Sequence, residues 1–503
     1  MPLRTSIVSL SAAGLLLSGC VDQQEESQEE APSYDAALEA FYEQDLSWED
    51  CEDEMLCATV RVPADYSDPD GAELGIDIIS SETAEGEDPP FLLTNPGGPG
   101  ASGVDLVIET GDFLFATEVT QQYNILGFDP RGVDRSAPVE CLSDDEMDEY
   151  REMEQDTQLD EDAAYEQALE ESAELGEKCL QNTGESLGHV DTVSAARDMD
   201  IIRAAVGQQT LDYLGFSYGT KLGLAYAEHF PESMGRFVLD GVMDVSISSH
   251  ELSLAQAEGF EDALHRYAQW CVEQQNCPVE GGADDVVSAV QDLFSEVEAE
   301  PVVGADGRTI TAGTLVSGFI LPMYDALGWP LLSEALEGAL TNDDYLAFQA
   351  WADQQAGRGL DGSYDWKSQL AFTAIMCLDY PMAEDQERIE EEFAETLEAS
   401  PTFGPYLGHS GVQCSQWPFE NVLEPWEPDL SEAPEMLLIG TTGDPATPVE
   451  WAENIHDQVP SSSLLVSDSE GHLAYRPGND CVVGEVDAFL LDGQLFEGRQ
   501  ECQ

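Results

Sequence analysis

A serine between small residues is the first feature of this sequence that suggests chemistry. Gly215, Ser217 and Gly219 form a G-x-S-x-G pattern in the stretch GFSYGT. In a sharp strand-to-helix turn, this pattern exposes the serine hydroxyl at the tip, where it can attack a carbonyl carbon. An apolar run, 211–216, precedes the serine, and a helical pattern opens at Lys221. That context favours a nucleophile over the alternative, a tight turn with a buried serine.

A serine nucleophile needs a base and a carboxylate that orients the base. After this type of turn, the usual chain order is serine, then acid, then histidine. His472 follows a strand-like run in SEGHLAY, and Asp444 follows another in LLIGTTGD. The two remaining late histidines lie in a helical pattern and in a region predicted below to be a lid. We predict Asp444 and His472 as partners of Ser217, with Asp240 in VLDGV as the alternative acid.

The glycine-rich stretch NPGGPG, residues 95–100, follows an apolar run. Glycines let backbone N–H groups approach a negatively charged tetrahedral intermediate closely. We predict that the N–H groups of Gly98 and Tyr218 form an oxyanion hole, with Gly97 as a further candidate donor. Because clusters of Gly and Pro usually form ordinary turns, the composition of this stretch alone would be weak evidence. The prediction depends on its location upstream of the G-x-S-x-G pattern.

Short apolar runs alternate with helical patterns through much of the chain, which predicts an α/β fold with a mostly parallel sheet and helices on both faces. Residues 58–66 and 73–81 suggest an opening antiparallel hairpin. Residues 191–207 have helical spacing, with Thr192 or Ser194 as the candidate N-cap. The other predicted strands lie within 90–100, 123–132, 211–220, 235–243, 434–444 and 462–472.

Two long segments interrupt the alternation: an acidic, helix-rich stretch at 141–190, and residues 246–430. The second is long enough to form a large helical cap, or lid, inserted between late strands. The predicted organisation is a signal peptide at 1–20, a disordered acidic tether at 21–40, a core in two parts at 41–245 and 431–503, and the cap between them.

The N-terminus, MPLRTSIVSLSAAGLLLSGC, combines a positive charge at Arg4 with an apolar run from Ile7 to Leu17. This pattern is typical of a secretion signal and is too short to span a membrane. The ending LSGC resembles a lipobox, which implies lipid attachment at Cys20; an ordinary signal peptide is the alternative. We expect an exported protein whose membrane contact is an N-terminal lipid anchor.

Eleven cysteines fit an oxidising compartment. Without Cys20, ten remain, and spacing alone does not fix their connectivity. None shows zinc spacing, so disulfides are expected and a metal is not. Taken in chain order, the ten form the pairs Cys51/Cys57, Cys141/Cys179, Cys271/Cys277, Cys377/Cys414 and Cys481/Cys502.

The chain carries 103 acidic residues against 17 Lys plus Arg, a formal net charge of −86. The acids are spread along the whole chain, which suits a solvated acidic shell over an ordinary core. Self-repulsion of this size destabilises a compact state unless salt screens it, so we predict a halophilic protein. Nucleic acid is excluded as a partner because phosphate contacts need Lys and Arg.

Together these motifs resemble the proline iminopeptidase-like α/β-hydrolases, in particular their exported tripeptidyl aminopeptidase branch. The resemblance implies an α/β-hydrolase core with a helical cap. It also implies release of short N-terminal pieces from peptides. The sequence departs from the family at Asn95, where a histidine is frequent, although the exported branch agrees, and at Asp134, where glycine is usual. The motifs that carry the resemblance are NPGGPGASG, LGFDPRGVDRS, GFSYGT, GTTGDPATP and EGH.

An aminopeptidase must recognise a free ammonium group, which requires a buried carboxylate. Asp379, in IMCLDYP, is the candidate, and the resemblance supports an acid at this position of the cap. The alternative is one more acid on a solvated face.

The sequence therefore predicts an exported serine exopeptidase that releases one to three residues from peptides with a free N-terminus and needs no cofactor. The alternatives are a carboxylesterase or lipase on the same core, and a lipoprotein that has lost its activity.

Overall fold

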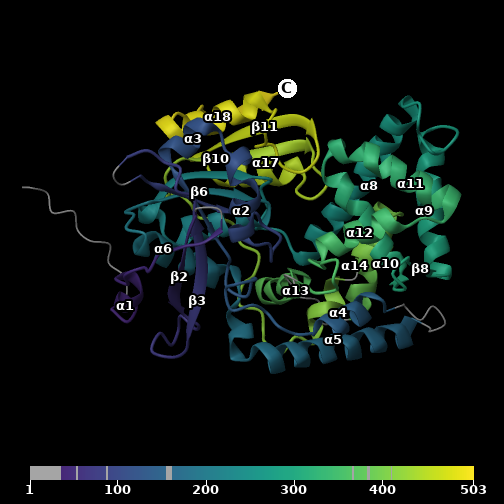
Figure 1. Ribbon diagram of the computed structural model, residues 1–503, viewed down its shortest axis with the longest axis horizontal. Helices are drawn as coiled ribbons and strands as arrows, with labels where there is room; N and C mark the ends of the chain where they lie inside the picture. Colours follow the sequence, from purple (N-terminus) through teal and green to yellow (C-terminus); the bar gives the residue numbers. More distant parts are fainter. Residues whose placement is uncertain are drawn as a thin grey trace, which may run out of the picture.

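A ten-stranded sheet lies in one half of the molecule in the computed structural model, in the order β1-β2-β3-β5-β4-β6-β7-β10-β11-β12 (Figure 1). The structure describes residues 36–52, 55–86, 89–153, 161–364, 368–381, 386–408 and 410–503. The strands are β1 Glu49–Asp50, β2 Leu56–Pro63, β3 Glu73–Ser80, β4 Phe91–Asn95, β5 Asn124–Phe128, β6 Leu211–Phe216, β7 Met234–Asp240, β10 Met436–Gly443, β11 Ser462–Glu470 and β12 Arg499–Cys502.

The strands from β5 to β12 in this order are parallel, while β1, β2 and β3 pair antiparallel at one edge. The predicted fold class, including the opening hairpin, is confirmed. The strand β5 is buried at every residue, and β4 and β6, the next two strands of the sheet, at all but one, as expected for a sheet covered on both faces.

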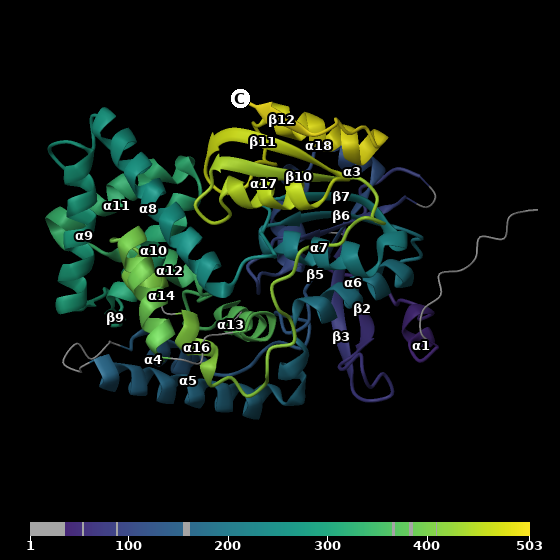
Figure 2. The same cartoon turned by 180° about the vertical axis from the view of Figure 1, so that it is seen from behind.

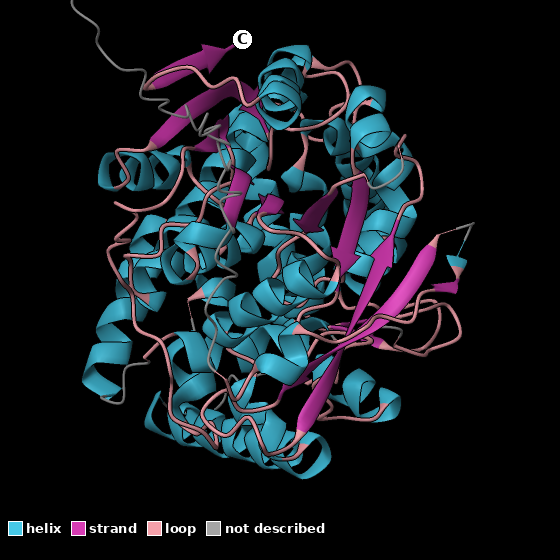
Figure 3. Cartoon of the chain, turned by 90° about the vertical axis from the view of Figure 1, so that its left-hand side faces the viewer, coloured by secondary structure: helices cyan, strands magenta, loops and turns pink. Residues whose placement is uncertain are grey.

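Helices cover both faces of the sheet, with the strands running between them in Figure 3. The helices α2 (Gly103–Leu114), α3 (Thr117–Gln122) and α18 (Asp480–Asp492) share one apolar cluster with the sheet. The helices α6 (Thr192–Ala205), α7 (Tyr218–His229) and α17 (Val449–Gln458) share the cluster of the opposite face. Two shorter helices complete the core: α1 Glu39–Tyr42 and η3 Pro231–Ser233.

Three local features differ from the sequence prediction. The strands β1 and β12 were not predicted, because both are short and polar. The N-cap of α6 is Asp191, whose side chain accepts a hydrogen bond from the Ser194 N–H, so neither Thr192 nor Ser194 is the cap. Helix α1 begins inside the predicted tether, and its residues Phe41 and Tyr42 are buried.

Residues 246–430 contain a helical cap beside the sheet, with an apolar core of its own (Figure 2). Its elements are α8 Ser249–Glu273, α9 Ala283–Ala299, α10 Ala312–Ile320, η4 Leu321–Tyr324, η5 Ala326–Gly328, α11 Trp329–Asn342, α12 Leu346–Gln355, α13 Ser368–Asp379, α14 Gln386–Ala399, α15 Gly404–Leu407, α16 Ser410–Ser415 and the small hairpin β8–β9, Val302–Val303 and Thr309–Ile310.

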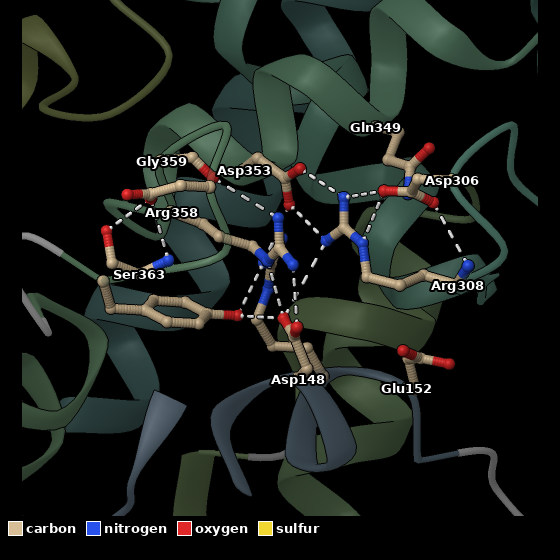
Figure 4. A network of polar contacts seen from close by, with 12 residues as sticks. Asp148, Glu152, Asp306, Arg308, Gln349, Asp353, Arg358, Gly359 and Ser363 are labelled. Carbon is tan, nitrogen blue, oxygen red and sulfur yellow. Dashed lines mark hydrogen bonds and ion pairs between the residues drawn. The ribbon is translucent and has the colours of Figure 1, made fainter. Parts of the chain in front are cut away.

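The segment at 141–190 forms α4 (Asp144–Arg151), α5 (Glu161–Thr183) and η2 (Glu185–His189), and it packs on the cap. A polar network joins α4 to the cap (Figure 4). Arg358 pairs with Asp148 at 2.7 Å, and Asp353 receives both Arg308 at 2.6 Å and Arg151 at 2.9 Å. The segment 141–190 is therefore bound to the cap through this polar network.

All five cysteine pairs taken in chain order are disulfides in the structure: Cys51–Cys57, Cys141–Cys179, Cys271–Cys277, Cys377–Cys414 and Cys481–Cys502. Cys377–Cys414 ties α13 to α16 inside the cap, and Cys481–Cys502 ties α18 to β12.

Among the described residues, no single helix has the length and apolar character to cross a membrane. One bent pair, Ala312–Tyr324 with Ala326–Asn342, meets the criterion by length and composition only.

Candidate active site

Ser217 occupies the turn between β6 and α7 with φ +54° and ψ −123°, a strained conformation for a residue other than glycine. Both motif glycines are needed for this turn. A Cβ on Gly215 would lie 2.5 Å from the Gly219 carbonyl oxygen, and a Cβ on Gly219 would lie 2.7 Å from the Asn95 carbonyl oxygen. From Tyr213 to Ala227, Ser217 alone is not buried. The turn thus exposes this one side chain.

Asp444 and His472 form a close pair at the ends of β10 and β11. The His472 Nδ1 lies 2.8 Å from Asp444 Oδ2 and 3.0 Å from Oδ1. The Asp444 side chain is fully buried, and 11% of the His472 side chain remains exposed. An acid in this position fixes the imidazole tautomer and stabilises the protonated ring.

The loop after Asp444 holds its carboxylate in place. The N–H groups of Ala446 and Thr447 donate to Oδ1 at 2.8 and 2.9 Å, and the Thr447 hydroxyl donates to Oδ2 at 2.8 Å. The same hydroxyl lies 3.2 Å from His472 Nδ1. Thr447 was not singled out from the sequence, although it belongs to the quoted motif GTTGDPATP.

Asp240, the alternative acid, has different partners. At the end of β7 its carboxylate accepts backbone N–H bonds from Ala474 at 3.0 Å and Tyr475 at 2.8 Å, and no hydrogen bond to His472 is present. Burial raises the pKa of Asp240 to about 6, although these bonds oppose the shift. Asp240 therefore supports the backbone after His472, while Asp444 contacts the ring.

The pKa of His472 is raised above its ordinary value of 6.5. Burial acts to lower it, but the charge and hydrogen bond of Asp444 outweigh burial, and the charge of Asp240 adds to the increase.

Ser217 and His472 each contact the turn that follows β7. The Ser217 N–H donates to the Asp240 carbonyl at 2.9 Å. A Cβ on the next residue, Gly241, would lie 3.2 Å from Cε1 of His472. The nucleophile candidate and the base candidate therefore both lie against the chain reversal after β7.

The glycine loop after β4 lies directly against the serine turn. Gly97 has φ +98°, and a Cβ there would lie 2.9 Å from both the Tyr218 amide nitrogen and the Ser217 Cβ. Gly98 follows with φ +106°. The Asn95 side chain accepts the Gly97 N–H at 3.0 Å and so orders the loop. Gly97 therefore lies beside the serine and the Tyr218 N–H, while the role of the Gly98 N–H as an oxyanion donor stays a prediction.

Asp134, the second departure from the family pattern, has φ +39°. The turn therefore keeps a backbone conformation that favours glycine, now with an aspartate whose side chain contacts Arg135. Burial raises the pKa of Asp134 to about 6.

Asp379, the predicted amine-binding residue, lies at the end of α13 and is buried together with Lys221 of α7. Its Oδ2 pairs with Lys221 Nζ at 2.9 Å, and its Oδ1 accepts the Thr192 N–H at 2.9 Å. The Thr192 hydroxyl also donates to Asp379 and lies 2.6 Å from the Tyr218 hydroxyl. These contacts favour a structural role for Asp379, in which it supports the serine turn. Binding of a substrate amine stays a prediction.

Three cap contacts at the site were not predicted, because no local pattern marks them. The Tyr324 ring lies 5.5 Å from the His472 ring, edge to face. Arg266 and Asp325 form ion pairs with residues that flank His472.

The described residues hold no cluster of three or more His, Cys, Asp or Glu suited to a metal ion. Cys20 lies outside the described residues.

A strained serine turn at the end of a parallel strand, with an aspartate–histidine pair beside it, defines a serine hydrolase of the α/β-hydrolase fold. Family models agree: residues 90–282 match "alpha/beta hydrolase fold", and residues 400–502 match "TAP-like protein".

Known relatives align with almost the whole chain. Serine protease Hip1 of Mycobacterium tuberculosis is 32% identical over 464 residues, which cover 89% of this chain and 87% of the relative. Carboxylesterase B of the same organism is 32% identical, with 89% and 86% covered. Tripeptidyl aminopeptidase of Streptomyces lividans is 28% identical, with 89% and 85% covered. The chain belongs to the same α/β-hydrolase family as Serine protease Hip1 and Carboxylesterase B. Its TAP-like match and its similarity to a tripeptidyl aminopeptidase agree with the resemblance that its motifs indicated.

Proposed function

We propose that this protein is an exported serine exopeptidase that releases one to three residues from the free N-terminus of peptides. The observation that carries the proposal is the buried Asp444–His472 pair beside the strained Ser217 turn, in a chain related to a tripeptidyl aminopeptidase and a serine protease.

In the proposed reaction, Ser217 Oγ attacks the scissile carbonyl carbon while His472 takes the hydroxyl proton. Asp444 stabilises the imidazolium that forms, and the N–H groups of Gly98 and Tyr218 stabilise the oxyanion. His472 then protonates the leaving amine. In the second half, water releases the acyl group by the same steps, and the proton returns to Ser217.

Cleavage near a chain end is supported by how the cap meets the site. Cap helix α13 contacts the glycine loop, where a Cβ on Gly100 would lie 2.7 Å from the Ser368 carbonyl oxygen, and η4 lies over His472. Cap segments thus adjoin both the oxyanion loop and the base. Such enclosure favours chain ends over internal segments of a folded protein.

Ester hydrolysis is the second candidate, because the relative named Carboxylesterase B is as similar to this chain as the protease. The fold and the triad do not choose between an amine and an alcohol as leaving group.

Export and work in high salt belong to the same proposal. Five disulfides and the signal-like N-terminus support export, and the LSGC ending supports a lipid on Cys20. The net charge of −86 supports a saline medium.

Fluorophosphonate labelling tests the nucleophile, and a substrate panel tests the reaction class. We expect labelling that Ser217→Ala abolishes, together with faster turnover of unblocked tripeptidyl amides than of p-nitrophenyl esters. Labelling that survives in Ser217→Ala would refute the proposed nucleophile. Faster turnover of the esters would favour the esterase.

A further inference from the structure

One face of cap helix α8 lies against the loop that carries Asp444. Gln256, Gly259 and Arg266 share this face, because their spacing of three and seven residues returns to the same side of a helix. The Gln256 Nε2 donates to the Ala446 carbonyl at 2.9 Å. A Cβ on Gly259 would collide with the Pro445 carbonyl oxygen, so the helix packs backbone against backbone here. The helix thus directly buttresses the two residues that follow Asp444.

Arg266 extends this contact to the second loop of the pair. Its Nε lies 2.7 Å from Glu470 Oε2, and its Nη2 donates to the Gly443 carbonyl at 3.1 Å. Gly443 directly precedes Asp444, and Glu470 stands two residues before His472. One guanidinium therefore bridges the two strand ends from which the acid and the base project.

A planar guanidinium suits this role because it presents several donors in a fixed geometry, whereas a lysine ammonium is a point charge on a flexible stem. The Arg266 side chain is 29% exposed and that of Glu470 is 40% exposed. Since solvent screens a pair of this exposure, its influence should lie in geometry more than in net stability.

The far side of the histidine loop is held by the cap as well. The His472 N–H donates to the Tyr324 carbonyl at 2.6 Å, and Asp325 pairs with Arg476 at 2.7 Å. A Cβ on Gly471 would lie 2.7 Å from the same Tyr324 oxygen, so cap and loop are in tight contact. His472 therefore lies between two cap contacts: Arg266 before it, and the 324–325 segment over and after it.

We propose that Arg266 is a positioning residue: by bridging Gly443 and Glu470 from the cap, it sets the geometry of the Asp444–His472 pair, so that the docked cap is part of the catalytic apparatus. This inference rests on the proposed triad, and it goes beyond the triad by assigning the alignment of that pair to a residue of the cap.

The test compares Arg266→Gln, Arg266→Lys and Glu470→Gln with Arg388→Gln, which removes an exposed pair with Glu392 on α14. Fluorophosphonate titration counts active sites, so that misfolded protein does not enter kcat. We expect Arg266→Gln to lose at least about tenfold in kcat with a smaller change in KM, because small displacements of catalytic groups cost large factors in rate. Arg266→Lys should recover part of the loss, and Arg388→Gln should match the wild type.

The pH profile separates positioning from a general structural role. His472 is faced by Asp444 and Asp240 from the core and by the Tyr324 phenol from the cap. If Arg266 aligns the pair, Arg266→Gln weakens the contact with Asp444, and the acid limb of kcat/KM moves to lower pH. Glu470→Gln should move it the same way, and the double variant should lose less than the product of the single losses.

A wild-type kcat per titrated site and an unmoved acid limb in Arg266→Gln would overturn the inference, as would a loss confined to the number of active sites. The Ser217→Ala variant tests the proposed triad separately from the proposed role of Arg266. If it keeps activity, the proposed triad fails, whatever the Arg266 variants do.

Discussion

At the scale of single residues, two buried aspartates lie close to His472 but have different partners. Asp444 contacts the imidazole through both oxygens, whereas Asp240 accepts the backbone N–H groups of Ala474 and Tyr475. Motif context in the sequence favoured Asp444, and the structure gives the physical reason for that choice. The separate role of Asp240 depends on a chain reversal that brings β7 to the histidine loop, which no local pattern reveals.

Replacing each aspartate by asparagine should separate their roles. Asp444→Asn should lower kcat by roughly 10³- to 10⁴-fold, because the amide favours the wrong imidazole tautomer. Asp240→Asn should cost much less, since an amide oxygen can still accept a backbone N–H. Steady-state kinetics of the two folded variants checks this, and a larger loss in Asp240→Asn would reverse the assignment.

The raised pKa of His472 predicts the pH dependence of catalysis. The imidazole must be neutral to accept the Ser217 proton, so kcat/KM should fall as the pH drops through a midpoint above the ordinary value of 6.5. Because Asp444 is the main cause of the increase, Asp444→Asn should move the residual acid limb to lower pH. Asp240→Asn should move the acid limb in the same direction but less far, because the charge of Asp240 adds a smaller part of the increase. A wild-type midpoint below 6.5 would contradict the electrostatic account.

At the scale of elements, helix α13 joins the cap to the catalytic core. Its C-terminal residue Asp379 forms a buried ion pair with Lys221 on the nucleophile helix α7, and Thr192 extends the network to the Tyr218 hydroxyl. Lys221 is one of three lysines in the chain, and its ammonium also lies 3.9 Å from the Tyr380 ring centroid. Because lysine is so rare in this chain, a buried Lys221 at this place favours a structural role for the Asp379–Lys221 pair, which holds the serine turn.

Asp379→Asn distinguishes support of the turn from recognition of a substrate amine. Because a buried lysine would lose its partner, we expect a loss of about 3–5 kcal/mol in the free energy of unfolding. Activity should fall equally on unblocked peptides and on p-nitrophenyl esters, which have no free amine. The paired variant Asp379→Leu with Lys221→Met should recover much of the stability. A selective loss on unblocked substrates with unchanged stability would instead establish the amine-binding prediction.

The sequence predicted elements better than the contacts between them. Apolar runs such as 434–444 and 462–472 became β10 and β11, because buried parallel strands are marked by their own composition. The short polar strand β12 carries no such mark and is fixed by its pairing with β11 and the Cys481–Cys502 disulfide. Asp379 was one acid among 103 until folding placed it against Lys221.

At the scale of the whole molecule, the surface charge and the contacts of the cap decide how we expect the protein to respond to salt. A net charge of −86 spreads over a chain whose core strands are buried at most of their residues, so the repulsion acts mainly on the surface. Several of the 14 arginines sit where the cap meets other parts, including Arg308 and Arg358 at α4 and Arg266 at the active site. Surface repulsion should therefore strain these interfaces first when salt is low.

Salt should stabilise the protein and raise its activity. The Debye length falls from about 10 Å at 0.1 M to about 3 Å at 1 M salt, which screens repulsion among exposed carboxylates. Both the melting temperature and kcat/KM should rise between 0.1 M and molar NaCl. Thermal melts and assays across this range check the expectation, and flat or falling values would refute adaptation to high salt.

The central claim is cleavage at a free N-terminus by Ser217, and mass spectrometry of the products from one unblocked peptide tests it most directly. The account predicts successive release of pieces of one to three residues, no cleavage of the N-acetylated twin, and no products with Ser217→Ala. Internal fragments from both peptides, or products that persist in Ser217→Ala, would contradict it.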